Sequence, residues 1–166
     1  MYRFFVEEGQ IEQGEAVITG GDVNHIRNVL RMRPGDKVMV SDGKERDYCC
    51  RLKEIGCDRV IADILEEKPA ETELPARLYL FQGLPKSDKM ELIIQKAVEL
   101  GVYQVIPVVT RRAVVKLDEK KEEAKVRRWN KIAESAAKQS GRSVIPQVTV
   151  VMSFKEALTF AGGFEV

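Results

Sequence analysis

The sequence predicts an α+β protein in which a small β-barrel precedes an α/β domain. In the first 70 residues short apolar segments alternate with turn residues, and residues 77–109 run in the order strand, basic loop, amphipathic helix, strand. Closely spaced short strands are typical of small barrels, whereas a strand–helix–strand order is typical of a parallel sheet. We therefore expect a barrel domain over residues 1–70, a linker over 71–75 and an α/β domain over 76–166.

Composition indicates a globular protein of one or two small domains. The 166 residues are 44% hydrophobic and 32% charged, and no apolar run approaches the roughly 20 residues needed to cross a bilayer. The amino terminus lacks the apolar core of a signal peptide, so we expect a cytoplasmic protein. Cys49, Cys50 and Cys57 form no CxxC pair and His25 is the single histidine, which argues against a metal site. We expect free thiols, buried or half-buried.

The first domain is expected to hold five strands and one short helix. The strands are predicted at residues 3–6, 16–19, 37–41, 48–55 and 59–65. Asp22 is a suitable cap for a helix over residues 23–30. His25, Arg27 and Arg31 lie on or beside this helix, and arginine guanidiniums suit phosphate groups. For His25 the alternative is an ordinary polar residue on a helix surface.

Charge is distributed unevenly along the chain. Residues 86–142 carry 14 basic and 8 acidic side chains, whereas residues 1–71 carry 11 basic and 15 acidic ones. A basic middle within a nearly neutral chain predicts a local patch for a polyanion. The alternative is a solvated helical face laced with ion pairs, which the mixed signs over residues 118–128 also support.

The second half contains a predicted βαβ unit with cations at one edge of its sheet. An acidic, proline-containing stretch over residues 66–74 reads as a linker. Lys86 follows the first strand, and Arg111 and Arg112 follow the second strand, residues 102–109. The carboxyl ends of parallel strands form the usual ligand edge, so these three side chains are expected to share it. Ser87 or Asp88 is a suitable cap for the intervening helix, and Gly101 suits the left-handed position just past its end.

A long helix, a strand and a further helix complete the predicted elements. The long helix begins at Asp118 and ends at Gly141; the later strand and helix are expected over residues 147–151 and 154–160. The buried stripe of the long helix is predicted to consist of Val126, Trp129, Ile132, Ala133, Ala136 and Ala137. Arg142 follows a helix, which places it at the opposite end of the sheet from Arg111. A homodimer could unite the two ends, or Arg142 could bind the last helical carbonyls.

Several segments together resemble one family. They are residues 25–32 (HIRNVLRM), 88–102 (DKMELIIQKAVELGV), 110–115 (TRRAVV) and 136–142 (AAKQSGR). In this combination and order they resemble the RsmE-type 16S ribosomal RNA uridine N3-methyltransferases, and the resemblance covers residues 1 to about 158. It implies a PUA-like barrel, a SPOUT-class domain with a trefoil knot, S-adenosylmethionine as methyl donor, and a homodimer acting on small-subunit rRNA.

The resemblance also implies roles for individual residues. Arg142 is expected to be the catalytic cation that stabilises the negative charge developing on the uracil as N3 is methylated. The expected substrate-binding residues are Arg3, His25, Arg27, Arg31, Lys86, Arg111 and Arg112.

The chain departs from the family pattern in its last part. The Gly-Pro-Glu-Gly-Gly loop and the Leu-Gly-x-x-Ile-Leu-Arg segment of the family's cofactor site do not occur in it, so no cofactor-binding residue can be assigned. The tail resembles a piece that follows the glycine-rich loop, which predicts a large missing segment between Phe160 and Gly163. Two alternatives to an enzyme follow: a non-catalytic RNA-binding fragment, and a fragment that self-associates through exposed sheet edges.

Overall fold

A computed structural model describes residues 1–44, 46–86, 89–110 and 119–164. The chain forms two compact units. The N-terminal unit consists of Met1–Glu73 together with Gly141–Val144, and the C-terminal unit consists of Leu74–Ser140 and Ile145–Val166. The chain therefore leaves the N-terminal unit after Glu73 and returns to it for four residues after the long helix.

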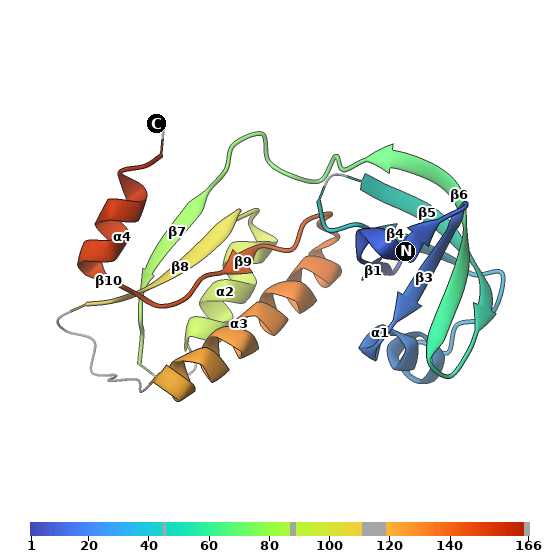
Figure 1. Cartoon of the computed structure of the whole chain (residues 1–166), viewed down its shortest axis with the longest axis horizontal. Helices are drawn as coiled ribbons and strands as arrows, with labels where there is room; N and C mark the ends of the chain where they lie inside the picture. Colours follow the sequence, from blue (N-terminus) through green and yellow to red (C-terminus); the bar gives the residue numbers. More distant parts are fainter. Residues whose placement is uncertain (45, 87–88, 111–118, 165–166) are drawn as a thin grey trace. The chain divides into compact units, whose positions relative to one another are not determined.

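The N-terminal unit is built on a curled six-stranded sheet (Figure 1). Its strands are β1 (Arg3–Phe5), β2 (Ile11–Glu12), β3 (Glu15–Thr19), β4 (Lys37–Ser41), β5 (Arg46–Ile55) and β6 (Arg59–Pro69), in the order β1-β4-β5-β6-β3-β2. Only the β1–β4 pair is parallel among these. All five predicted strands are present. The stretch over residues 66–74 that reads as a linker starts too early, because residues 66–69 continue β6 by pairing with the first residues of β5.

Alternating side chains of this sheet form one apolar core. Fully buried examples are Ile18, Val38, Val40, Leu52 and Val60. The 3₁₀ turn η1 (Glu8–Gln10) precedes β2, and the predicted helix over residues 23–30 is split into α1 (Gly21–Asn24) and a π-helical turn η2 (His25–Val29). Both pieces contribute a buried side chain to the core, which explains why their apolar spacing resembled that of one helix.

The C-terminal unit has a parallel sheet flanked by helices. The strands are β7 (Tyr79–Gly83), β8 (Gln104–Val109), β9 (Gln147–Val148) and β10 (Met152–Ser153), with β8 pairing to the other three. The helices are α2 (Lys89–Glu99), α3 (Glu119–Ser140) and α4 (Phe154–Ala161). The βαβ unit is therefore confirmed. The predicted cap at Asp88 and the extended piece at residues 114–117 lie outside the described residues.

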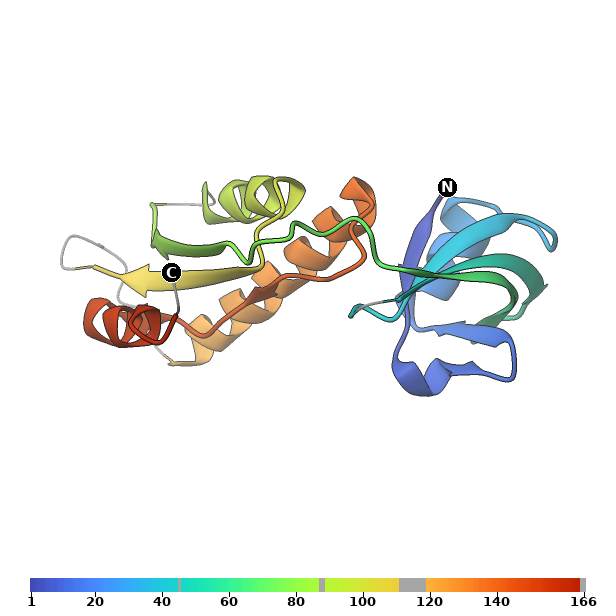
Figure 2. The ribbon, with the colours of Figure 1, turned by 90° about the horizontal axis from the view of Figure 1, so that it is seen from above.

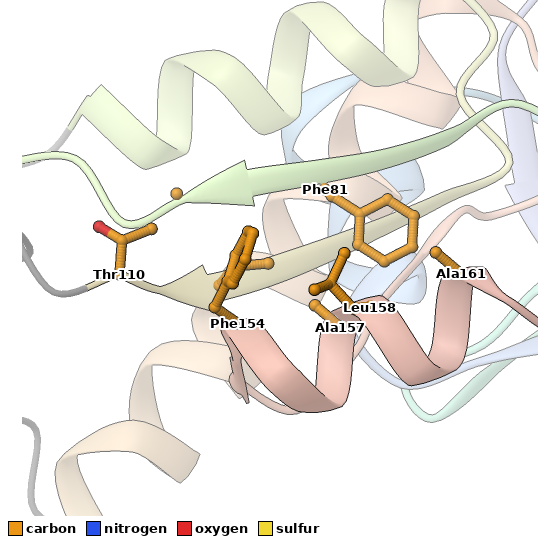
Figure 3. Close-up of a pocket in the computed structure, with 8 residues that line it drawn as sticks. Phe81, Thr110, Phe154, Ala157, Leu158 and Ala161 are labelled. Carbon is orange, nitrogen blue, oxygen red and sulfur yellow. The ribbon is translucent and has the colours of Figure 1, made fainter.

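Helices α2 and α4 lie on opposite faces of this sheet (Figures 2 and 3). Ile106 and Val108 of β8 pack against Ala157 of α4, while α2 buries its own apolar stripe. The stripe predicted for α3 is confirmed at four of its positions: Trp129, Ala133, Ala136 and Ala137 are buried. Gly101 ends α2 at φ +93°, as its position predicted. No helix among the described residues is long and apolar enough to cross a membrane.

The three thiols are free but differ in accessibility. Cys50 is buried and Cys49 half-buried, whereas Cys57 is exposed, contrary to the prediction that all three would be covered. The position of Cys57 in the turn between β5 and β6 accounts for this. Burial raises the pKa of the Cys50 thiol to about 12, so the nucleophilic thiolate is scarce there.

We expect a thiol reagent at pH 8 to modify Cys57 rapidly and Cys50 only after unfolding. Release of the coloured thiolate from Ellman's reagent should show one fast phase that the Cys57→Ser variant lacks. A fast phase that survives in Cys57→Ser and disappears in Cys50→Ser would contradict this arrangement.

Candidate RNA-binding site and the polar cluster of the N-terminal unit

Three predicted RNA-binding residues lie together on an irregular turn of the N-terminal unit. His25 and Arg27 belong to η2, and Arg31 follows it with φ +52°, a left-handed conformation that is costly for a side chain larger than glycine. All three are exposed. The His25 ring meets the Phe4 ring edge-on, with centroids 6.5 Å apart.

A π-helical turn followed by a left-handed residue is an unusual local structure, and such irregularities are frequent at functional sites. It is held by local backbone bonds: Leu30 N donates to His25 O, five residues back, at 2.8 Å, and Met32 N donates to Ile26 O at 3.0 Å. Within the described part of the chain, no carboxylate is recorded in an ion pair with Arg27 or Arg31. Their guanidiniums are thus available for phosphate.

Arg3, also predicted to bind substrate, points instead into the N-terminal unit. Its Nη1 lies 2.5 Å from Asp47 Oδ1 and donates to the Ser41 hydroxyl, and both side chains of the ion pair are about nine-tenths buried. Ser41 and Asp47 are opposite one another in the β4–β5 ladder. Arg3 pairs with Met39, two residues before Ser41, so the three side chains share one face.

Ser143, from the loop after α3, completes this cluster. Its hydroxyl donates to Asp47 Oδ2 at 2.7 Å and lies 3.1 Å from Arg3 Nη1 and 2.7 Å from the Thr72 hydroxyl. One donated and two accepted bonds are all that a serine hydroxyl can make. Ser143 is fully buried, and its burial costs little because its hydroxyl makes all of its possible hydrogen bonds.

Arg142, the predicted catalytic residue, is paired internally. Only 5% of the residue is exposed. Its Nε lies 3.3 Å from Glu73 Oε1, and its Nη2 donates to Glu73 Oε2. Glu73 Oε1 also accepts from the backbone amides of Ser143 at 3.2 Å and Val144 at 3.3 Å. Glu73 is thus a carboxylate partner of Arg142, and the alternative that Arg142 binds the last carbonyls of α3 stays a prediction. Its catalytic role stays a prediction.

The Asp47 carboxyl is the ionisable centre of the cluster. Burial acts to raise its pKa, but hydrogen bonds from Arg3, Ser143 and Ser41, with the charge of Arg3, outweigh burial and lower the pKa. A carboxyl whose pKa is lowered by folding contributes stability above its unfolded pKa of about 4, and that contribution is lost as the pH falls through the lower folded value.

We therefore expect acid to destabilise the N-terminal unit through Asp47. The free energy of unfolding, measured by urea titration from pH 6 to pH 2.5, should fall more steeply below about pH 4 for the original chain than for Asp47→Asn, which cannot titrate there. Parallel curves for the two proteins would show that Asp47 is not a source of the acid sensitivity.

In the C-terminal unit, Lys86 lies beyond the carboxyl end of β7 and is exposed. The residues just before Lys86 lie beside the end of β8, since Leu84 N donates to Val108 O at 3.0 Å. Arg111 and Arg112 lie outside the described residues, so only Lys86 of the predicted rim is placed. This end of the sheet also bears a cavity of about 290 Å³.

The cavity is apolar. Phe154 and Leu158 point from α4 towards β7 and β8, and Phe81 and Thr110 line the opposite side (Figure 3). S-adenosylmethionine carries a sulfonium, an ammonium, a carboxylate and a polar purine, and such a ligand needs several placed polar groups. Among the described lining residues the Thr110 hydroxyl is the single polar side chain, so this cavity does not fit that cofactor. Within the described ranges no group of three or more potential ligands could hold a metal ion.

Comparison with known proteins identifies the family. Residues 72–165 match the model for an RNA methyltransferase domain, and residues 18–65 match the model for an RNA methyltransferase PUA domain. The chain belongs to the RNA methyltransferase family. Ribosomal RNA small subunit methyltransferase E of Bacillus subtilis is 43% identical to it over 161 residues, which are 95% of this chain and 63% of that protein.

Solved structures support the same assignment for this methyltransferase chain. A ribosomal RNA small subunit methyltransferase E from Neisseria gonorrhoeae, bound to S-adenosyl methionine, superposes with a TM-score of 0.85 at 35% identity, covering 95% of this chain and 65% of that one. The expected fold class, a PUA-like domain followed by a SPOUT-type domain, is confirmed. The chain spans less than two thirds of the length of the Bacillus subtilis relative.

One expectation about the tail is wrong. The Mesomycoplasma hyopneumoniae relative, 30% identical, matches all of this chain within 171 aligned residues. Such an alignment leaves no room for a large additional segment between Phe160 and Gly163. In the structure the Phe164 ring stacks on Tyr79 with centroids 4.1 Å apart.

The polar cluster was not predicted. Asp47, Thr72, Glu73 and Ser143 carry no motif, and the separation of Asp47 from Ser143 by 96 positions hides their contact. One signal was available: Asp47 directly precedes the apolar start of the predicted strand over residues 48–55, and a carboxylate buried there requires a partner.

Proposed function

We propose that this chain is the RNA-binding portion, with part of the methyltransferase domain, of an enzyme that methylates N3 of a uridine in 16S rRNA. The observation that carries the proposal is the family match over residues 72–165, joined to a PUA-type unit whose exposed cations lie on an irregular turn. We further propose S-adenosylmethionine as methyl donor, the small ribosomal subunit as substrate, a homodimer as the working assembly and a cytoplasmic location.

The chemistry requires a proton to leave and a negative charge to be stabilised. Uridine N3 carries a proton, and as the nitrogen becomes nucleophilic the charge spreads onto the two flanking carbonyl oxygens. Cations or amide donors near those oxygens would lower the barrier. Arg142 was predicted to do this, but its burial and its pairing with Glu73 leave that role a prediction only. Lys86 is exposed at the ligand edge of the sheet and is the described cation best placed for phosphate there.

A binding role without catalysis is the second candidate for this chain. The apolar character of the described cavity favours it, because the residues that line this cavity do not match the cofactor. Titration calorimetry of this chain with S-adenosylmethionine decides between the two. The enzyme proposal predicts no heat from this chain and heat from the chain joined to the unmatched part of the Bacillus subtilis relative, whereas a purely binding role predicts heat from neither. Heat of equal size from both would place the cofactor site within the present residues.

RNA affinity should depend on the cations of η2. We expect the double variant Arg27→Ala/Arg31→Ala to bind a small-subunit rRNA fragment about 10-fold or more weakly. The slope of log affinity against log salt concentration should fall by an amount that corresponds to about one to two phosphate contacts. Filter binding between 50 and 250 mM salt measures both quantities.

The matched control is Arg46→Ala/Lys68→Ala. It removes the same charge from the same unit, but Arg46 and Lys68 are already paired with Glu67 and Glu66. An equal loss in the two double variants would mean that binding follows net charge and that η2 is no specific contact surface.

A further inference from the structure

The loop Gly141–Val144 is bound to the N-terminal unit by a set of contacts that converge on two consecutive residues. Thr72 Oγ1 accepts from Ser143 N at 2.9 Å, and Glu73 Oε1 accepts from the Ser143 and Val144 amides. The Glu73 carboxylate also binds the Nε and Nη2 of Arg142. Thr72 and Glu73 thereby bind the backbone amides of this loop, and Glu73 also binds the Arg142 side chain.

The second side of the loop is held by the Arg3–Asp47 pair. Ser143 donates to Asp47 and lies within hydrogen-bond distance of Arg3, and Val144 forms an isolated parallel bridge with Gly43. Two ion pairs therefore flank four residues of chain: Arg3–Asp47 is nearly buried, and in Arg142–Glu73 the arginine is buried and the carboxylate half-buried. We call the set Arg3, Asp47, Thr72, Glu73, Arg142 and Ser143 the clasp.

The geometry of the clasp bears on how Arg142 acts. A side chain that is 6% exposed and bound to a carboxylate through two of its nitrogens is held in one orientation. Removing one member of a buried pair is costly, because the other charge stays buried without a partner. Direct contact with a base would require Arg142 to give up Glu73 and the loop to leave its amide bonds.

We propose that Arg142 is a positioning residue: through Glu73 it fixes the loop Gly141–Val144 onto the N-terminal unit, and it does not touch the uridine. The role of Arg142 in methyl transfer rests on the proposed function. The contacts of the clasp do not depend on that function. The loop joins α3, which ends at Ser140, to β9, which begins at Gln147. Clasping it fixes the chain between two elements of the methyltransferase domain.

Hydrogen exchange on the chain as it exists tests the clasp. We expect Glu73→Gln and Arg142→Gln each to speed exchange of the Ser143 and Val144 amides at least 10-fold, with core amides of β5 unchanged. Arg142→Lys should fail to restore protection, because lysine has no fork to match the carboxylate. The matched control is Arg128→Gln, which breaks an exposed pair with Glu91 in the other unit and should change neither amide.

If Glu73→Gln and Arg142→Gln prevent folding, hydrogen exchange can be measured on a variant that leaves both charges in place. Thr72→Val removes only the hydroxyl that accepts from Ser143 N, and Thr72 itself is exposed. It should raise exchange of the Ser143 amide several-fold. Unchanged exchange at Ser143 and Val144 in the variants that fold would overturn the clasp.

Methyl transfer distinguishes positioning from contact. In the chain completed with the unmatched part of the Bacillus subtilis relative, a positioning role predicts that Glu73→Gln and Arg142→Gln slow transfer by the same factor, and that the double variant is no slower than either. A contact role predicts that Arg142→Gln alone abolishes transfer while Glu73→Gln, which frees the arginine, retains it; that result would overturn the inference. If the completed chain transfers no methyl group, the proposed function fails, and hydrogen exchange still decides on the clasp.

Discussion

The Asp47→Ala variant should unfold with a free energy about 3–5 kcal/mol below that of the original chain, the cost of breaking a buried ion pair from one side. The variant leaves the Arg3 guanidinium buried with no carboxylate, since Arg3 and Asp47 are only 9% and 8% exposed at their side chains. It also removes the acceptor of the Ser41 and Ser143 hydroxyls. Urea unfolding followed by far-UV circular dichroism measures the loss.

The control for this variant is Asp63→Ala on the same sheet. Asp63 lies 3.6 Å from Lys53 and is 47% exposed, and exposed pairs of this kind contribute about 0–1 kcal/mol. The two variants delete the same side chain, so the difference between them isolates burial. A loss below about 1 kcal/mol for Asp47→Ala would contradict the role given to the cluster.

The Ile106→Ala variant should lose about 2–5 kcal/mol from the C-terminal unit, the usual cost of emptying a core site. Ile106 is fully buried in the central strand β8 and packs with Val108 and Ala157. It lies opposite Phe81 in the β7–β8 ladder, so the cavity would open beneath the strands that carry Lys86. Thermal or urea unfolding of the variant measures the loss.

Val109→Ala is the matched control, because Val109 belongs to the same strand and is 38% exposed. We expect a loss well below that of Ile106→Ala, in keeping with its smaller buried area. Equal losses would mean that strand propensity, and not packing of α4 against β8, determines the stability of this sheet.

Local patterns predicted the elements well where one physical rule decides the structure. Val38 and Val40 alternate with Lys37 and Met39, and β4 buries the two valines while Lys37 is exposed and Met39 half-buried. The α3 stripe around Trp129 follows the helical period in the same way. The π-turn of η2 could not be predicted, because Val23 and Ile26 have the spacing of an ordinary helix and backbone bonding leaves no trace in composition.

The candidate site was predicted in part, and the remainder depends on long-range contacts. The exposed positions of His25, Arg27 and Lys86 agree with a surface role. Arg3 and Arg142 have the same chemistry, yet each has a carboxylate partner far away in sequence. A sequence shows that an arginine is present; it does not show whether its partner is a phosphate or a buried Asp47.

Nucleoside analysis of methylated rRNA tests the central claim most directly. Small subunits would be incubated with S-adenosylmethionine and this chain completed with the unmatched part of the Bacillus subtilis relative, and the 16S rRNA digested and resolved by mass spectrometry. We expect N3-methyluridine at a single site, with no product when the cofactor is omitted. Methylation at carbon or ribose oxygen, or on another base, would contradict it.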